Sequence, residues 1–280
     1  MTDIQPKKRT YIVNAIDFEG RIAASRAFIQ SCDLGDSLPV GYMKRSAMKL
    51  TEEARKEVDE QSTEAFIAND TIVSIVGGVS TKNRQIVKDC MLLASKAAAR
   101  KYPEGGVEWF QAYTRVLSEI GWTTHASSFS DYKASNSSFT MAQEGLTILQ
   151  SAITAAVTPG PATGLMLKVA ADAIAALKDS DKPLELFNTA SKKHNGAKFA
   201  MGSVVEDEEK GLVVAMGVVD FTTSLNETNV LFWTWNSSSV GIKRVENYLT
   251  FNELHFAGVA DDVREKLNES SRKFLIDLEI

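Results

Sequence analysis

Apolar residues recur at helical spacing between Asp17 and Cys32, and this pattern predicts an amphipathic helix. The residues that repeat are Phe18, Ile22, Ala23, Ala27 and Phe28. The short β-branched run Thr10 to Ile16 ahead of it is typical of a strand, and Gly35 to Gly41, which contains Pro39, is expected to be a loop.

Three more helices are predicted before residue 121. The first covers Thr51 to Val76, with Thr51 as N-cap and Gly77-Gly78 as its end. The second starts at a cap on Ser80 or Thr81 and runs to about Lys101, and the third covers Val107 to Ile120. Trp122 to His125 and Phe129 to Tyr132 then look extended.

The stretch from Met141 to Lys178 is poor in charge. Two helical runs, Met141 to Val157 and Ala162 to Lys178, are joined by Thr158-Pro-Gly-Pro161. Between Gly145 and Leu177 the only charged residues are Lys168 and Asp172, one helical turn apart. The pattern predicts an αα-hairpin with a short loop.

After Pro183 the sequence changes to alternating β-branched and aromatic residues, which predict strands. The expected strands are Lys198 to Val205, Gly211 to Thr223, Thr228 to Asn236 and Val240 to Phe256. Their short connections favour an antiparallel meander. Asp261 to Phe274 is expected to form a closing helix, and Leu275 to Ile280 a last strand.

These elements predict an α+β fold, with a helical N-terminal two-thirds and an apolar αα-hairpin packed on a C-terminal antiparallel sheet and a closing helix. One domain is expected over residues 1–280, of which about 1–182 form the helical part and about 183–280 the sheet part.

Composition excludes several classes of protein. The 280 residues are 44% hydrophobic and 24% charged, which is too apolar for an intrinsically disordered chain. A net charge of -5 argues against a nucleic-acid partner. Without a signal-type apolar region or a run of membrane-spanning length, the protein is expected to be cytoplasmic or exported without a cleavable signal peptide.

Catalytic and metal-binding patterns are weak. Val76-Gly-Gly-Val-Ser-Thr-Lys82 resembles a phosphate-binding loop but lacks the required spacing, so we interpret it as a turn with a Ser or Thr cap. The histidines, His125, His194 and His255, are far apart, and a hydrolase built on one of them is the third choice of function. Cys32 and Cys90 are interpreted as buried small hydrophobes. No cofactor and no metal are expected, and we lean against an enzyme.

The apolar hairpin is the main candidate for function, with two interpretations. It either leaves the fold to enter a bilayer or bind an acyl chain, or it is a central helix pair covered by the sheet. Trp233 and Trp235 are expected on one face of a strand, where they could form an aromatic patch. The candidate membrane or ligand residues are Leu146, Leu149, Ile153, Leu165, Leu167, Ile174, Trp233 and Trp235.

Several segments resemble a group of mostly uncharacterised bacterial and fungal proteins associated with the insect-gut virulence factor Evf. The segments are Val76 to Arg84, Trp109 with Tyr113, Ile120-Gly-Trp122, and Phe129 to Phe139 ahead of the hairpin. The resemblance implies a soluble α/β protein without known enzymatic activity, which acts at a host gut and is tied to membranes by an acyl chain on a cysteine of the strand region. Here that region has no cysteine, and Ser203 or a neighbour stands at the corresponding place, so no functional residue is carried over.

The sequence therefore predicts a non-enzymatic, virulence-factor-like or toxin-like protein that engages a membrane or a hydrophobic ligand through the hairpin. The alternative is a protein-binding module or assembly subunit that uses the same apolar surface as an interface. The partners considered are a membrane lipid or acyl chain, a protein partner, and a second copy of the chain.

Overall fold

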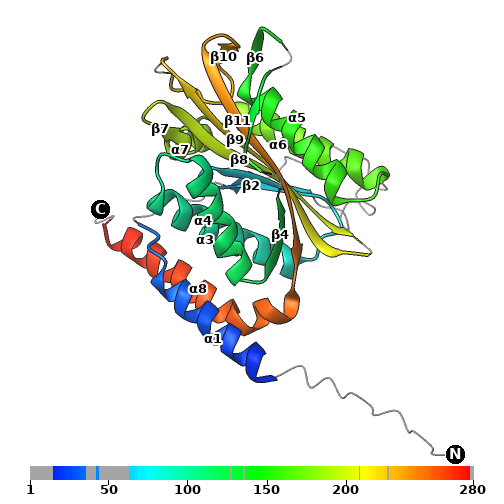
Figure 1. Cartoon of the computed structure of the whole chain (residues 1–280), viewed down its shortest axis with the longest axis vertical. Helices are drawn as coiled ribbons and strands as arrows, with labels where there is room; N and C mark the ends of the chain where they lie inside the picture. Colours follow the sequence, from blue (N-terminus) through cyan, green and yellow to red (C-terminus); the bar gives the residue numbers. More distant parts are fainter. Residues whose placement is uncertain are drawn as a thin grey trace, which may run out of the picture.

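A computed structural model describes residues 15–35, 42–43 and 63–277, with gaps at 127, 135, 208 and 226. Its centre is a nine-stranded sheet with the order β1-β2-β3-β8-β9-β11-β4, to which β5 and β7 are added beside β11 and β8 (Figure 1). The pairs are antiparallel except for β3 and β8, which are parallel. The strands are β1 Tyr42–Met43, β2 Glu64–Ala68, β3 Thr71–Ile75, β4 Trp122–Ala126, β5 Ser130–Tyr132, β7 Lys192–Lys193, β8 Gly196–Asp207, β9 Gly211–Thr223 and β11 Val240–Phe251.

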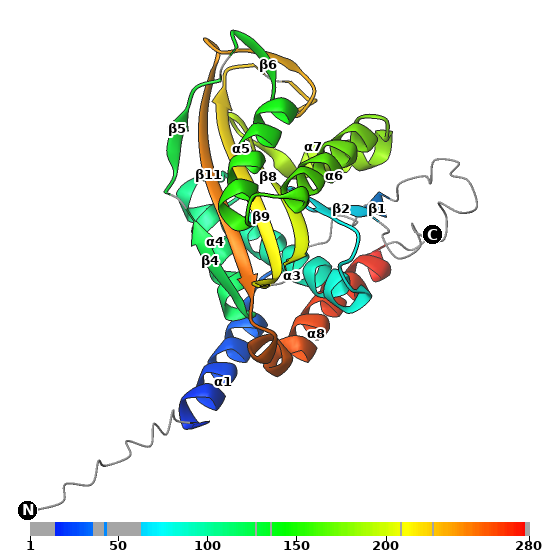
Figure 2. The ribbon, with the colours of Figure 1, turned by 90° about the vertical axis from the view of Figure 1, so that its right-hand side faces the viewer.

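Helices cover both faces of this sheet. On one face lies the hairpin of α5 (Met141–Ala156) and α6 (Pro161–Lys178), followed by α7 (Asp181–Ser191) (Figure 2). On the other lie α3 (Thr81–Lys101) and α4 (Gly106–Glu119). Beyond these, α1 (Ala15–Ser31) and α8 (Glu253–Asp277) pack along each other and against α4 and α3. The molecule is therefore layered, with a mixed sheet in the middle.

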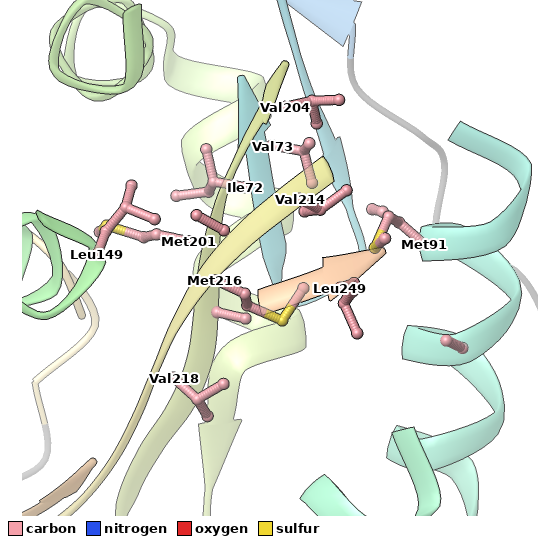
Figure 3. Packing of buried hydrophobic residues seen from close by; sticks show 14 of the residues in the cluster. Ile72, Val73, Met91, Leu149, Met201, Val204, Val214, Met216, Val218 and Leu249 are labelled. Atoms are coloured by element: carbon pink, nitrogen blue, oxygen red, sulfur yellow. The ribbon is translucent and has the colours of Figure 1, made fainter. Parts of the chain in front are cut away.

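The apolar core occupies both faces of the sheet. Figure 3 shows sheet side chains such as Met201, Val214 and Leu249 between Leu149 of α5 on one side and Met91 of α3 on the other. All five of these residues are at most 2% exposed. Because both faces are covered, β3, β8 and β9 are buried along nearly their whole length and do not alternate between buried and exposed residues.

The predicted helix over Thr51 to Val76 is wrong where the structure describes it, and its first part, 51–62, lies outside the described residues. Residues 64–75 form the β2–β3 hairpin, whose turn contains Asn69 with φ +58°. Every residue of β3 is buried. A short apolar run buried on both sides looks the same in sequence whether it is a strand or a helix, and that ambiguity misled the prediction.

The prediction of a helical N-terminal two-thirds is therefore also wrong, since β1 to β5 and the short strand β6 (Ser138–Thr140) all precede α5. The mixed α+β class itself is confirmed, and so are the extended segments at β4 and β5. The proposed strand at Thr10 to Ile16 lies largely outside the described residues, and its last two residues begin α1. Most of the loop 35–41 likewise lies outside them.

Three of the other predicted helices are confirmed. In α1 the buried face consists of Ile22, Ser25 and Ile29, whereas Ala23 and Ala27 are exposed. Ser80 caps α3 by accepting the N–H of Asn83, as expected. The Ser80 N–H in turn donates to Glu206 Oε1 at 3.0 Å, so a carboxylate of the protein itself lies where a phosphate would bind.

The αα-hairpin is confirmed and closely follows its predicted bounds. A capping box of Thr140 and Gln143 starts α5, and Pro161 stands in the first turn of α6. The side of the hairpin that faces the sheet packs closely on it. An added Cβ at Gly217 of β9 would lie only 2.8 Å from the backbone nitrogen of Leu149 in α5. Within the described residues no helix combines the length and the apolar character needed to cross a bilayer.

The C-terminal meander of β8, β9 and β11 is confirmed, with two corrections. Of the predicted strand 228–236 only β10 (Thr234–Asn236) forms, and it pairs with β6 (Ser138–Thr140) in a separate two-stranded sheet. β11 ends at Phe251, where the Asn252 side chain accepts the His255 N–H at 3.0 Å and helps to start α8. The predicted final strand is wrong over 275–277, which continue α8, and 278–280 lie outside the described residues.

Candidate functional site

The eight residues predicted to meet a membrane or ligand do not share one surface. Leu149 and Ile153 are fully buried on the sheet, and Ile174 is 6% exposed. Leu146 and Leu167 are half-buried against the core, and Leu165 is 41% exposed. The sheet thus covers the apolar side of the hairpin, while Thr and Gln residues occupy much of the outer side of α5.

The space between the hairpin and the sheet is too small for a ligand. The cavity that Leu146, Ile174 and Met201 line there has a volume of about 10 Å³. For comparison, an apolar cavity that binds benzene has a volume of roughly 150 Å³. An acyl chain has no room at this place.

Trp233 and Trp235 do not form an aromatic patch. Trp233 lies in the bend before β10 and is 42% exposed, whereas Trp235 is 2% exposed. The Trp235 ring packs edge-on to Phe221 at 5.1 Å, and its Nε1 donates to the Val230 carbonyl at 3.4 Å. The expectation of one shared face is wrong because Trp233 precedes the strand.

Ser203 lies at the centre of the sheet. It is fully buried, and its hydroxyl donates to the Met166 carbonyl of α6 at 3.1 Å. This residue therefore links β8 to the hairpin and is not accessible for modification.

The histidines are not arranged for nucleophilic catalysis in the described part of the chain. His125 stacks on Tyr248, and His194 lies in the turn after β7. His255, in α8 and not in the expected strand, has Nε2 2.9 Å from the Glu119 carbonyl and 3.3 Å from the Ser25 hydroxyl.

A carbonyl oxygen only accepts hydrogen bonds, so His255 Nε2 carries the hydrogen. It cannot then accept a proton from Ser25, whose hydroxyl donates to Glu119 Oε2 at 3.0 Å. Ser25 is also 2% exposed. The cluster joins α1, α4 and α8 structurally and does not activate a nucleophile.

A more promising site is a groove between α1, α3 and α4, which we call the helical groove. It has a volume of about 500 Å³, within the range of roughly 300–1,000 Å³ typical of small-molecule sites. Its apolar part includes Phe28 of α1, Ala97 of α3, and Ala112 and Val116 of α4. It can therefore accept an apolar body of moderate size.

The rim of the helical groove is charged. Arg100, Lys101 and Arg115 are exposed cations there, against the carboxylates of Asp33 and Glu108. Arg100 pairs with Asp33, with Nε 3.0 Å from Oδ2. The excess over carboxylates is therefore one positive charge.

Two of these cations rest on aromatic rings. The Arg115 guanidinium carbon lies 4.9 Å from the centre of the Phe28 ring, and Lys101 Nζ lies 5.5 Å from that of Tyr102. Neither has a carboxylate partner among the residues that the structure describes. Cation–π contacts orient such groups and leave their charge available to an anion.

Cys32 lies in the wall of the helical groove with its thiol half-buried, donating weakly to the Phe28 carbonyl at 3.5 Å. Burial raises the pKa of this thiol, and the charges of Lys266, Arg115 and Lys101 act in the opposite direction. The thiol is therefore neutral near pH 7, yet it experiences the positive potential of the groove. Cys90 is fully buried, and burial raises the pKa of its thiol strongly.

Sequence reasoning missed the helical groove. Phe28 and Cys32 were both noted, but as core residues, and Arg100, Lys101 and Arg115 were not singled out. Phe28 and Arg115, which meet in the groove, are 87 positions apart along the chain, so no local spacing indicated the site.

Comparisons with protein-family models and with curated proteins find no match. Among solved structures the chain is similar to the structure of the Evf virulence factor, with a TM-score of 0.34 and 10% sequence identity over 74% of this chain and 82% of that chain. The resemblance expected from the sequence is thus confirmed as a weak structural likeness.

Proposed function

We propose that this is a non-enzymatic binding protein of the virulence-factor-like or toxin-like kind, which engages a hydrophobic ligand carrying an anionic group. The site is the helical groove and not the α5–α6 hairpin. The observation that carries the proposal is an apolar cavity whose rim holds two cations, Lys101 and Arg115, that rest on aromatic rings and have no carboxylate partner among the described residues.

Using the hairpin instead would be costly. Swinging it off the sheet exposes Leu149, Ile153 and Ile174, at about 1.5–3 kcal/mol for each side chain, and it also uncovers the sheet beneath them. The groove needs no such rearrangement, because it is already open between three helices.

The alternative of an assembly subunit lacks a comparable surface. Within the described residues the large apolar side chains that are exposed are Val107, Leu165, Leu225, Trp233 and Leu254. They belong to four different segments, of which only the connection between β9 and β10 holds two, Leu225 and Trp233. Single exposed apolar residues are normal on soluble proteins.

Two fluorescent probes with the same aromatic body test the proposal. Anilinonaphthalene sulfonate carries an anion, and N-phenylnaphthylamine does not. We expect saturable binding of the sulfonate at one site and binding of the neutral probe that is weaker by about tenfold, since one charge contact is worth about 1.4 kcal/mol. Lys101→Gln and Arg115→Gln should each weaken the binding of the sulfonate and leave the binding of the neutral probe unchanged. Lys182 is an exposed residue of α7, and Lys182→Gln should change the binding of neither probe.

Cys32 makes the test specific to the groove. A bound probe should slow alkylation of Cys32 by N-ethylmaleimide, with the buried Cys90 as an internal control. An unchanged rate for Cys32 at saturating sulfonate places the probe elsewhere and contradicts the proposal. Flotation with vesicles of anionic or neutral lipid then distinguishes a lipid surface from a free ligand: binding to anionic vesicles that is lost in Arg115→Gln identifies the lipid.

A further inference from the structure

Four charged residues of alternating sign lie in one row across the sheet. In the strand register Lys243 of β11 pairs with Asp131 of β5 on one side and with Asp220 of β9 on the other, and Asp220 pairs with Lys198 of β8. Figure 2 shows β5, β11, β9 and β8 side by side, with β5 at the edge. Residues directly opposite each other in a register point to the same face, so this row faces α4.

The inner end of the row is fully paired. Lys198 is 1% exposed, and its Nζ lies 2.8 Å from Asp70 Oδ2, which is itself buried. Asp220 forms an ion pair with Lys193 and accepts the Gly106 N–H, the first residue of α4, at 2.8 Å. These contacts hold the Asp220 carboxylate in one position, while its oxygens keep lone pairs for further hydrogen bonds.

The outer end of the row is open. Asp131 and Lys243 are exposed, as is Lys133 beside them, and none of the three has an ion-pair partner in the part of the chain that the structure describes. Lys243 does not pair although its strand neighbours are carboxylates. Its ammonium group is therefore available to a ligand.

A pocket of about 520 Å³ lies over this open end, and Asp131, Lys133, Asp220 and Lys243 all line it. We call it the polar pocket. Its walls offer partners of both signs: Asp131 and the lone pairs that Asp220 keeps beside Lys193 can accept hydrogen bonds from an ammonium group, and Lys133 and Lys243 can donate to a carboxylate. A ligand of a single charge would leave either Asp131 or the two lysines without a partner, whereas a ligand carrying both charges can pair with both.

We propose that the polar pocket binds a small zwitterion of the α-amino-acid type. Its ammonium group would lie toward Asp220 and Asp131, and its carboxylate toward Lys243 and Lys133. The rigid sheet places these groups before binding, which lowers the entropic cost of ordering the site. This site is separate from the helical groove, and the proposal does not depend on the function proposed for the groove.

Three probes that differ by one charge test this site. Alanine carries both charges, N-acetylalanine lacks the cation, and alaninamide lacks the anion. In proton–nitrogen correlation NMR spectra of the full chain, we expect alanine to shift the amide signals of Gly106, Thr222 and Gly241 saturably. N-acetylalanine and alaninamide should bind with an affinity at least about tenfold lower.

Exposed residues of the row supply the variants. Asp131→Asn and Lys243→Gln should each weaken the binding of alanine by about tenfold or more. Lys182→Gln on α7 is the matched control and should leave the binding of alanine unchanged. The proposal is overturned if alanine causes no saturable shift, if N-acetylalanine or alaninamide binds as well as alanine does, or if both variants bind alanine unchanged. Since Asp131 and Lys243 make no ion pair with any residue that the structure describes, unfolding of the variants is not expected, and the dispersion of the same spectra verifies this.

Discussion

Buried polar side chains in this protein fall into two groups. Asp70 is satisfied by Lys198 and by the Ser95 hydroxyl. Asn247 of β11, by contrast, is 1% exposed, and neither its amide nitrogen nor its amide oxygen has a partner among the described residues. An unpaired buried polar group costs about 1–3 kcal/mol, so Asn247 is a local weakness of the core.

Replacing Asn247 with leucine should therefore raise the free energy of unfolding, by about 1–3 kcal/mol. Leucine is close to asparagine in shape and removes the unpaired amide from the interior. Urea denaturation of both proteins measures the change, provided that the free energy of unfolding depends on the urea concentration with the same slope in both.

Asn247→Asp provides the opposite control, because it places a carboxylate in the same buried position, and it should destabilise the protein. If Asn247→Leu is destabilising, the amide has a partner in solution, such as an ordered water molecule, and the interpretation is wrong.

At the scale of elements, the sequence predicts the helices better than the outer strands. The αα-hairpin was found because two long periodic runs are separated by Pro159 and Pro161. The β2–β3 hairpin was missed because residues 64–75 are apolar without alternation, and only the turn at Asn69-Asp70 separates the two strands. Burial on both sides erases the period that distinguishes a strand from a helix.

The contact between α5 and the sheet depends on a glycine. At Gly217 an added Cβ would lie 2.8 Å from the Leu149 nitrogen, which is a backbone atom and cannot rotate away. Gly217→Ala should therefore push α5 outward and lower the free energy of unfolding by about 1–3 kcal/mol. Denaturation followed by circular dichroism measures this loss.

Gly202 of β8 is the matched control. Its added Cβ would meet nothing closer than 3.6 Å, so Gly202→Ala should be neutral, or stabilising by about 0.5 kcal/mol through the unfolded chain. Equal effects of the two substitutions would show that α5 does not pack as closely as the structure indicates.

On the scale of the whole molecule, the strands from the first part of the chain complete the sheet. β3 pairs with β8, and β4 pairs with β11, so these strands flank the C-terminal meander on both sides. The expected division at about residue 182 therefore cuts through one shared core. The meander alone would expose the apolar faces that α3, α4, α5 and α6 cover.

We accordingly expect that fragments 1–182 and 183–280 do not fold separately, and that the full chain unfolds in one cooperative transition. Thermal melts of each fragment, of their mixture and of the intact chain measure this. Cooperative unfolding of 183–280 by itself would show that the sheet part is an independent domain.

The sequence by itself determined the positions of α3, α4, α5 and α6, the C-terminal meander and the mixed α+β class. These features follow from periodicity, caps and turns, which act over a few residues. Tertiary structure decided that the hairpin is covered, that β2, β3 and β4 join the meander, and that Phe28, Lys101 and Arg115 meet in one groove while Asp131, Asp220 and Lys243 meet in another. Packing brings together residues distant in the chain, and no local pattern records which faces it will bury.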